Sequence, residues 1–310
     1  MTAVATARLD AELVRRGLAR SRARAAALVD GGHVTVDGTP ARKPAQPVAA
    51  AAQIVVAASD DDVSRGAQKL AGALDAVSAL TPDVPGAAGA RCLDAGASTG
   101  GFTQVLLRHG AAHVLAVDVG HGQLDPAVAA DPRVTAVEGV NVRDLDLTVL
   151  AHSIGPDRAP DVGSPVDLVV ADLSFISLRT VVEALVRATR AGGRLLLLVK
   201  PQFEVGRERL GRGGVVVSAD LRVEAVVGVA RALEALGVRL LAVVPSPVPG
   251  ESGNRELFLW GVRSDPGTPP TPASPAPDLE VGVRRAVERA VPVLLAAGPD
   301  PTPGEGGGPS

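Results

Sequence analysis

Over residues 1–58, the pattern of apolar and polar positions changes from a helical period to a strand-like one. Apolar residues recur at helical spacing within 8–18, and a second helix is predicted over 21–32, where two glycines end the run. The segments 33–36 and 53–57 alternate as half-buried strands do, and an Asp-Gly turn follows the first of them. The pattern therefore predicts a small α+β unit at the start of the chain.

Beyond residue 65, near-continuous apolar runs alternate with helical segments predicted from Thr103, from Leu178 and over 219–236. Such long apolar runs suit strands buried on both faces, as in a parallel sheet with helices on either side. The last two runs, separated by a Pro/Gly loop, predict a closing hairpin. We therefore expect an α/β fold with a Rossmann-like, doubly wound sheet after the small unit. The predicted strands are RCLDAG, AHVLAVDVG, PVDLVVADLSF, GGRLLLLVK, RLLAVVPS and NRELFLWGV.

Changes in composition suggest where the domains begin and end. A run of three aspartates is typical of a linker, and two later stretches are rich in proline and glycine. We predict a small domain over 1–58, a linker over 59–64, a large domain over 65–263, a Pro-rich linker over 264–277, a short helix over 278–297 and a disordered tail over 298–310.

The composition limits the class of protein. A chain of 310 residues with 46% hydrophobic and 21% charged residues is globular and can bury a sizeable core. Its one cysteine, Cys92, excludes a disulfide framework and a multi-cysteine zinc site, and we expect no metal. No apolar run reaches the ~18 residues of a membrane-spanning helix, and the N-terminal segment lacks the apolar stretch of a signal peptide. We expect a cytoplasmic protein.

Charge is distributed unevenly along the chain. Residues 1–58 carry eight basic and four acidic residues, a net charge of +4, which leaves −7 for the remainder of a chain whose net charge is −3. A basic module attached to an acidic domain suggests contact with RNA or DNA. An ordinary solvated helix face explains the same charges equally well. The arginines that could meet phosphates are Arg8, Arg15, Arg16, Arg20, Arg22 and Arg24.

Lysine is scarce, with three residues against 28 arginines. Arginine does not lose its proton in proteins, whereas lysine can. A lysine in this chain therefore marks a candidate position where arginine would not serve. Lys43 lies in a Pro-rich loop and is interpreted as a solvated side chain, which leaves Lys69 and Lys200.

A glycine-rich turn, CLDAGASTGGF, follows the first long apolar run. A strand ends near Asp94, and Gly96, Gly100 and Gly101 let the backbone approach a ligand closely before a helix begins. The next strand ends at Asp118, where a carboxylate holds the ribose diol in nucleoside-binding sheets. A tight turn without a ligand is the alternative for the glycines alone. The two features together favour a nucleoside-containing cofactor.

Charged residues also follow the later strands. Asp172 ends one apolar run and Lys200 ends the next, so both are expected at the same edge of the sheet. With Lys69 and Glu256, they could form a site in which a partly desolvated amine takes a proton from a hydroxyl group. A buried structural ion pair between Asp172 and Lys200 is the alternative. The sequence alone does not show that the four residues meet.

These motifs resemble a known family. The segment RLDAELVRRGLARSRARAAALVDGGHVTVDG is similar to the S4-type RNA-binding module. Taken together in this order, the later motifs resemble the TlyA family over roughly residues 7–262. They are VSRGAQKL, CLDAGASTGGFTQVLL, AVDVGHGQL, DPRV, VVADLSFISL, LVKPQFEVGR, GGVV and PGESGNRELFLW. The family comprises S-adenosylmethionine-dependent rRNA 2′-O-methyltransferases with an FtsJ-like domain, some of them named haemolysins.

The resemblance implies a role for each candidate residue. The family's Lys-Asp-Lys-Glu tetrad falls on Lys69, Asp172, Lys200 and Glu256, with Lys200 as the general base. S-adenosylmethionine contacts are implied for Asp94, Gly96, Ser98, Thr99, Gly100, Gly101, Phe102 and Asp118. The implied reaction is methyl transfer to the ribose of cytidine in 16S and, for some members, 23S rRNA within ribosomal subunits.

Two departures from the family pattern stand out. Asp60, Asp61 and Asp62 replace an aromatic residue before VSRG, and three acids near an RNA surface would repel phosphates. His121 stands where the family has an aromatic residue. Three other functions compete with the methyltransferase: an RNA-binding protein without catalysis, a base methyltransferase, and a pore-forming haemolysin. The complete tetrad argues against an RNA-binding protein without catalysis. The lack of an aromatic Asn-Pro-Pro-type loop argues against a base methyltransferase, and the lack of a membrane-spanning run argues against a pore-forming haemolysin.

Overall fold

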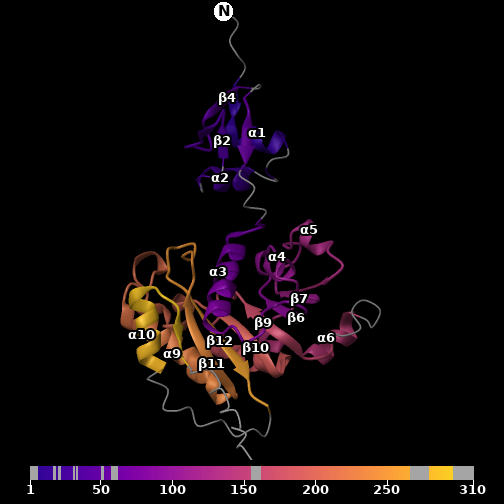
Figure 1. The fold of residues 1–310 in the computed structure, drawn as a ribbon, viewed down its shortest axis with the longest axis vertical. Coiled ribbons are helices and arrows are strands. Elements are labelled where there is room, and N and C mark those ends of the chain that lie inside the picture. Colours follow the sequence, from indigo (N-terminus) through magenta and orange to yellow (C-terminus); the bar gives the residue numbers. More distant parts are fainter. Residues whose placement is uncertain are drawn as a thin grey trace, which may run out of the picture. The chain divides into compact units, whose positions relative to one another are not determined.

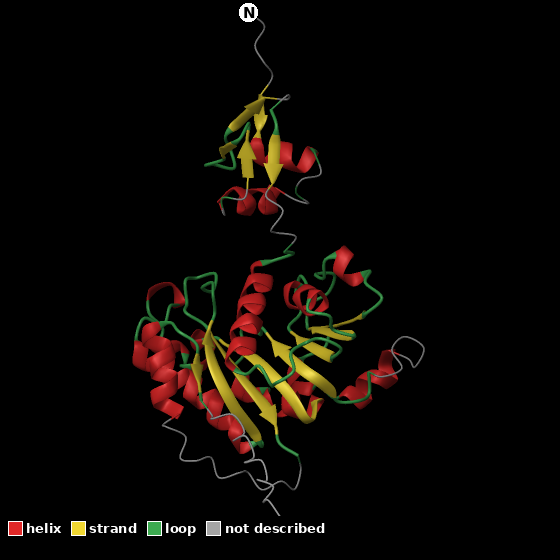
Figure 2. Cartoon of the chain, in the orientation of Figure 1, coloured by secondary structure: helices red, strands yellow, loops and turns green. Residues whose placement is uncertain are grey.

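The computed structural model describes residues 6–16, 19, 22–30, 32, 34–49, 52–56, 62–154, 162–265 and 279–295. The chain divides into two compact units, one ending at Asp61 and the other beginning at Asp62 (Figures 1 and 2). Each unit has a hydrophobic core of its own. The segments 266–278 and 296–310, which include most of the predicted Pro-rich linker and the predicted tail, lie outside the described residues.

The described residues of the small unit form two helices and five short strands. Strand β1 pairs antiparallel with β4, and β2 lies between β3 and β5 in a second antiparallel sheet. The predicted Asp37-Gly38 turn is present, with positive φ at both residues, and it leads into the short β3 before β5 joins. The elements are β1 (Thr6–Arg8), α1 (Leu9–Arg15), α2 (Arg22–Asp30), β2 (Val34–Val36), β3 (Thr39–Pro40), β4 (Pro47–Ala49) and β5 (Ile54–Val56).

The large unit contains an eight-stranded mixed sheet in the order β13-β11-β12-β10-β9-β6-β7-β8 (Figure 1). Neighbouring strands from β8 to β10 run parallel, whereas β12 is antiparallel to both β10 and β11. This confirms both the predicted doubly wound sheet and the closing hairpin. The strands are β6 (Arg91–Ala95), β7 (His113–Asp118), β8 (Val134–Glu138), β9 (Val166–Ala171), β10 (Thr189–Val199), β11 (Val238–Pro245), β12 (Leu257–Arg263) and β13 (Val293–Leu294).

Helices cover both faces of this sheet, and alternate residues of each strand supply the two cores. Leu196 and Leu198 of β10 pack with α3 and α4, whereas Leu195 and Leu197 face α7, α9 and α10. The α-helices are α3 (Arg65–Leu80), α4 (Gly101–Arg108), α5 (Pro126–Ala129), α6 (Leu147–Ile154), α7 (Val182–Ala188), α8 (Pro201–Glu204), α9 (Ala219–Ala235) and α10 (Leu279–Arg289). The 3-10 helices are η1 (Val142–Asp144), η2 (Leu178–Thr180), η3 (Arg207–Arg209) and η4 (Arg212–Gly214).

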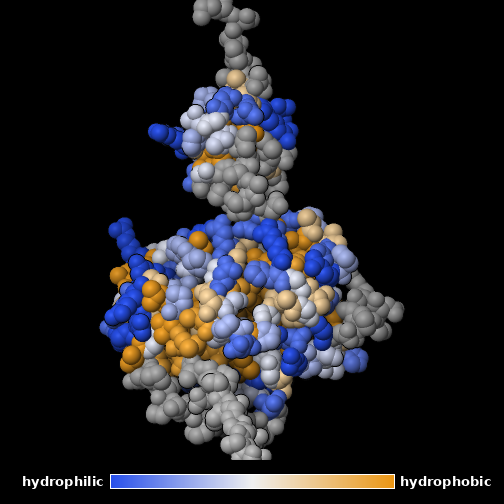
Figure 3. Space-filling view, viewed as in Figure 1, coloured by the Kyte–Doolittle hydropathy of each residue, from blue (hydrophilic) through white to orange (hydrophobic). Residues whose placement is uncertain are grey.

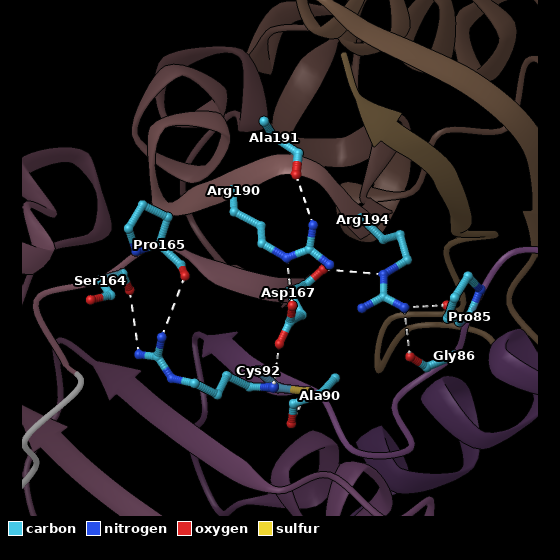
Figure 4. Close-up of polar contacts among 11 residues, drawn as sticks. Pro85, Gly86, Ala90, Cys92, Ser164, Pro165, Asp167, Arg190, Ala191 and Arg194 are labelled. Atoms are coloured by element: carbon cyan, nitrogen blue, oxygen red, sulfur yellow. Dashed lines mark hydrogen bonds and ion pairs between the residues drawn. The ribbon is translucent and has the colours of Figure 1, made fainter. Parts of the chain in front are cut away.

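A polar network joins β6, β9 and β10 near the ends where these strands begin (Figure 4). The Asp167 carboxylate accepts hydrogen bonds from the Arg91 N–H (2.8 Å) and from Arg190 Nε (2.6 Å). Burial alone would raise the pKa of Asp167, but these hydrogen bonds together hold it below its ordinary value. Buried Arg194 donates to the carbonyl oxygens of Pro85 and Gly86, which fastens the loop before β6. This edge is therefore held in place by polar contacts.

The thiol of Cys92 lies beside the same network and is fully buried. Burial raises its pKa to about 12, so the thiol stays protonated and is a poor nucleophile. Cys92 acts here as a small apolar side chain.

Candidate active site

A cavity of about 740 Å³ lies at the carboxyl ends of the parallel strands in the large unit. It adjoins the loops that follow β6, β9 and β10, where the strand order reverses between β6 and β9. In doubly wound sheets this is where ligands bind. The N-terminal part of α3 and the segment before β12 complete its wall.

The glycine-rich turn between β6 and α4 forms one side of the cavity. Gly96 adopts φ 86°, and a Cβ at this position would lie 2.9 Å from the main-chain oxygen of Asp172. Only glycine combines this conformation with such a close approach. Of the residues predicted to contact a cofactor, Gly96, Ser98, Thr99, Gly101 and Phe102 line the cavity.

Asp118 and Asp94 do not line the cavity but are bonded to the turn and to α4. The Asp118 carboxylate accepts hydrogen bonds from the N–H groups of Ser98 (2.8 Å) and Gly120 (2.7 Å), and thereby fixes the turn against the end of β7. Asp94 is fully buried and accepts a hydrogen bond from the Thr103 hydroxyl at 2.7 Å. Burial raises the pKa of Asp94 to about 7.

Gly100, the remaining residue of the turn predicted to contact a cofactor, precedes α4 at φ 92° and packs beside Leu124 rather than facing the cavity. His121, which replaces an aromatic residue of the family pattern, is exposed and also lies outside the cavity lining.

The wall of the same cavity also contains the four residues of the predicted tetrad, which are Lys69, Asp172, Lys200 and Glu256. Lys200 Nζ lies 2.7 Å from Asp172 Oδ1, and Lys69 Nζ lies 4.0 Å from the other oxygen of the same carboxylate. Lys69 also donates to Glu256 Oε2 at 2.6 Å. Two buried cations and two anions thus alternate in one chain of contacts, which keeps the charges balanced within a largely desolvated wall.

The arrangement of the strands explains why these four side chains lie together. Asp172 and Lys200 directly follow β9 and β10, neighbouring parallel strands whose carboxyl ends share one edge. Glu256 precedes β12, and because β12 is antiparallel to β10 its first residues lie at the same edge. Lys69 comes from α3, which packs across α4.

The loop after β9 contributes further residues that the sequence motifs did not assign to the site. Lys200 Nζ donates to Ser174 Oγ at 2.8 Å. Phe175 adopts φ 65° and is 91% exposed, yet its ring lies 5.5 Å from that of Phe203. An exposed aromatic ring on a strained backbone at the cavity wall is unusual for packing alone. In the sequence, the aromatic residue of ADLSF is the one signal that could have found it.

Buried Glu204 ties this loop to the segment that carries Lys200. Its carboxylate accepts hydrogen bonds from the Ser177 hydroxyl (2.5 Å) and the Leu178 N–H (2.7 Å). The two segments are therefore connected at both ends, by Lys200 on one side and by Glu204 on the other.

Arginines of the small unit are arranged around two buried carboxylates. Asp10 accepts hydrogen bonds from Arg8 and Arg22, and Glu12 from Arg15 and Arg16. Hydrogen bonds from Arg15 and Arg16 lower the pKa of Glu12 to about 2.

The side chains of Arg8, Arg15 and Arg22 remain more than half exposed, and hydrophilic side chains predominate on the described face of this unit in Figure 3. Four arginines against two acids leave this described cluster with an excess of two positive charges. Arg20 and the side chain of Arg24 lie outside the described residues.

The last residues of the predicted linker pack within the large unit. Asp62 is buried and pairs with Arg108 of α4 at 2.6 Å, and the Val63 N–H donates to Gln104. The charge of Asp62 is thus neutralised within the unit, so this aspartate does not act as a free repulsive charge. Asp60 and Asp61 lie outside the described residues.

Two negative findings concern the part of the chain that the structure describes. No cluster of three His, Cys, Asp or Glu side chains there is arranged to hold a metal ion. None of the described helices combines the length and apolar character that crossing a membrane requires.

Comparison with known proteins agrees with this architecture. Residues 63–263 match the FtsJ-like methyltransferase family, and residues 7–54 match the S4 domain. The chain is 52% identical over 256 residues to the 16S/23S rRNA (cytidine-2′-O)-methyltransferase TlyA of Mycobacterium tuberculosis, which covers 82% of this chain and 89% of the relative. It is also 31% identical to Hemolysin A of Brachyspira hyodysenteriae, over 81% of this chain and 98% of the relative.

A solved structure gives the same result. A candidate hemolysin from Streptococcus thermophilus superposes with a TM-score of 0.65 at 30% identity, covering 93% of this chain and 96% of that one. The FtsJ-like match spans well over half of the chain, and the similarity to TlyA extends across both units. The chain therefore belongs to the TlyA family of methyltransferases, with an S4 domain followed by an FtsJ-like domain.

Proposed function

We propose that this protein transfers a methyl group from S-adenosylmethionine to the ribose 2′-OH of a cytidine in 16S or 23S rRNA. One observation carries the proposal: the Lys200 amine lies 2.7 Å from Asp172 in the wall of a cavity that the glycine-rich turn also lines. A buried amine beside a nucleoside-binding turn suits removal of a proton from a sugar hydroxyl. The TlyA relative of M. tuberculosis is named for methylation at this position.

The turn after β6 fits S-adenosylmethionine. The cavity is lined here by Gly96, Ser98, Thr99, Gly101 and Phe102, and a Cβ at Gly96 would press against the main chain of Asp172. Among the other predicted contacts, Asp94 and Gly100 support the turn from behind. Asp118 terminates β7, where a carboxylate suits a ribose diol, and each carboxylate oxygen can accept a further hydrogen bond.

In the proposed reaction, Lys200 in its neutral form accepts the proton of the 2′-OH. When bound, S-adenosylmethionine supplies a methyl group on a sulfonium, which the 2′-oxygen takes as the carbon–sulfur bond breaks and sulfur keeps the electron pair. Asp172 holds the Lys200 amine and balances the charge that it gains. Lys69 and Glu256, joined at 2.6 Å, fix the far side of Asp172. Because the methyl donor is already activated, positioning supplies much of the rate.

The small unit and the exposed Phe175 ring provide the proposed RNA contacts. Arg8, Arg15 and Arg22 present guanidinium groups that can pair with phosphates, as shape-based recognition of folded RNA requires. Phe175 offers a face on which a base swung out of its stack can rest. Arg16, Arg20 and Arg24 of the predicted set stay predicted RNA contacts, and Arg20 and the side chain of Arg24 lie outside the described residues. An enzyme with this substrate works where ribosomes are assembled, in the cytoplasm.

Transfer of tritiated methyl groups to unmethylated 30S subunits, 50S subunits and free rRNA tests the function. We expect incorporation into a single cytidine whose following phosphodiester resists alkali, and its loss in both Lys200→Ala and Lys69→Ala, with S-adenosylmethionine binding retained. An alkali-sensitive product would indicate base methylation. Tight RNA binding without any transfer would favour the RNA-binding protein without catalysis.

A further inference from the structure

We propose that Ser174 is a positioning residue that directs the lone pair of the Lys200 amine into the cavity. This inference rests on the function proposed above, in which Lys200 is the general base. Ser174 belongs neither to the Lys-Asp-Lys-Glu tetrad nor to the glycine-rich turn. It lies two residues after Asp172 in the loop that follows β9, and it lines the same cavity.

Ser174 and Asp172 bind the same nitrogen. Lys200 Nζ lies 2.7 Å from Asp172 Oδ1 and 2.8 Å from Ser174 Oγ. Both oxygen atoms come from one short loop, so their separation is set by the backbone. Among the residues that the structure describes, the Ser174 side chain takes part in one hydrogen bond, which it accepts from Lys200. The hydroxyl group is therefore committed to this amine.

A neutral amine needs a directional contact in order to have a fixed orientation. Such an amine carries two hydrogens and one lone pair, and it rotates freely about the Cε–Nζ bond. Lys200 donates a hydrogen bond to Ser174 Oγ, whereas its 2.7 Å contact with Asp172 Oδ1 is an ion pair without hydrogen-bond geometry. The hydrogen bond to Ser174 is therefore the directional contact that sets the rotation of the amine and the direction of its lone pair. Because Lys200 lines the cavity, we infer that a 2′-OH there meets this lone pair.

The second lysine provides a contrast. Lys69 donates to Glu256 at 2.6 Å, and its other acidic neighbour, Asp172, is 4.0 Å away, beyond hydrogen-bonding distance. The Lys69 amine is thus held by one short contact, whereas the Lys200 amine is held by two. This difference favours Lys200 as the lysine whose orientation matters for proton transfer.

Without Ser174, the Lys200 amine would keep the ion pair with Asp172, which does not fix its rotation. The ring of Phe203 lies near Nζ, 6.0 Å from nitrogen to centroid, but an aromatic face attracts a cation and does not fix rotation. Loss of orientation at a reacting group lowers the rate of the chemical step and leaves binding intact. We therefore expect the effect of Ser174 in kcat and not in KM.

The test compares Ser174→Ala with Ser174→Thr, which keeps the hydroxyl group. Ser174 is exposed, so both side chains fit without repacking the core. Thr180→Val is the matched control, because it removes from the same segment a hydroxyl group that bonds to the Ser177 carbonyl and lies outside the cavity lining. Single-turnover methyl transfer at saturating rRNA and S-adenosylmethionine gives the rate, and titrations give KM and the cofactor Kd.

We expect kcat of Ser174→Ala to fall about tenfold, a typical loss for a group that orients a reacting partner. KM and the cofactor Kd should stay within about twofold of wild type, Ser174→Thr should recover most of the rate, and Thr180→Val should resemble wild type. An unchanged kcat in Ser174→Ala, or an equal loss in Ser174→Thr, would overturn the role of Ser174 while an inactive Lys200→Ala still upheld the base. Full activity in Lys200→Ala would overturn both.

Discussion

The turn after β6 requires glycine at position 96 for two reasons, and a Gly96→Ala substitution tests both. The first is conformational, since Gly96 has φ 86°, and an L-residue in the left-handed region costs roughly 1–2 kcal/mol. The second is spatial. The added Cβ would lie 2.9 Å from the main-chain oxygen of Asp172 and 2.9 Å from Leu173 Cδ2, where an ordinary contact begins at 3.4 Å. The loop carrying Asp172 must therefore retreat by about half an ångström.

Gly237 provides the matched control for the conformational demand. It has φ 79°, a Cβ added there would have no atom within 4 Å, and it lies before β11 at the opposite edge of the sheet from the cavity. Gly237→Ala therefore has the strain of a positive φ without the clash. Each variant should lower the melting temperature by about 2–8 °C, since 1 kcal/mol corresponds to roughly 2–4 °C in a domain of this size.

The two variants should differ in activity. Displacing Asp172 disturbs its 2.7 Å contact with Lys200, and because a 1 Å misplacement costs about a hundredfold in rate, half of that displacement costs about tenfold. We expect Gly96→Ala to lose methyl transfer to this extent and to bind S-adenosylmethionine more weakly, as measured by calorimetry, whereas Gly237→Ala keeps both. Equal activity and cofactor affinity in the two variants would refute the spatial part of the reasoning.

Three further substitutions test other parts of the molecule. Asp94→Asn preserves an acceptor for Thr103 but removes an acid whose pKa is raised to about 7 in the folded protein. Between about pH 4 and 7 the folded protein retains this proton and the unfolded chain does not. The free energy of unfolding of the wild type therefore falls by up to about 4 kcal/mol as pH rises across that range. In urea unfolding, the free energy of unfolding of Asp94→Asn should therefore rise relative to that of the wild type as pH rises. A difference between the two proteins that stays constant with pH would contradict this. Phe175→Ala should reduce methylation at least tenfold with an unchanged melting temperature, because the ring is 91% exposed; a large fall in melting temperature would instead indicate a packing role. Arg22→Ala should weaken RNA binding and reduce the slope of log Kd against log salt by about 1, and an unchanged slope would remove Arg22 from the phosphate contacts.

The sheet and the charged residues at the carboxyl ends of its strands were predictable from the same pattern, an apolar run followed by a charged residue. A long apolar run can be satisfied only inside the sheet, and the first charged residue after it must emerge at the strand's carboxyl end. Asp172 and Lys200 obey this rule. Glu256 and Lys69 do not follow such runs. The scarcity of lysine singled out Lys69, but that Lys69 and Glu256 meet the other two residues was implied only by the family resemblance.

Helix α3 shows why other elements escaped prediction. Its sequence contains Gly66 and Gly72, and each glycine within a helix costs up to about 1 kcal/mol relative to alanine. The structure explains Gly72, since a Cβ there would lie 2.9 Å from the ring of Pro247. Close packing against Pro247 thus requires glycine at position 72 of the helix that carries Lys69. The local sequence does not indicate this packing.

Ser174 and Asp94 mark the limit of inference from strand ends. Asp94 lies near the end of an apolar run just as Asp172 follows one, yet Asp94 points into the core and Asp172 reaches the cavity. The side that each carboxylate faces depends on the alternation of the strand and on what packs against it, in this case Thr103 of α4. No sequence pattern marks Ser174, and the role proposed for it depends on a hydrogen bond of 2.8 Å from Lys200, 26 positions away. A strand end thus predicts which residues gather at an edge, whereas the contacts between those residues decide which of them hold the Lys200 amine in place.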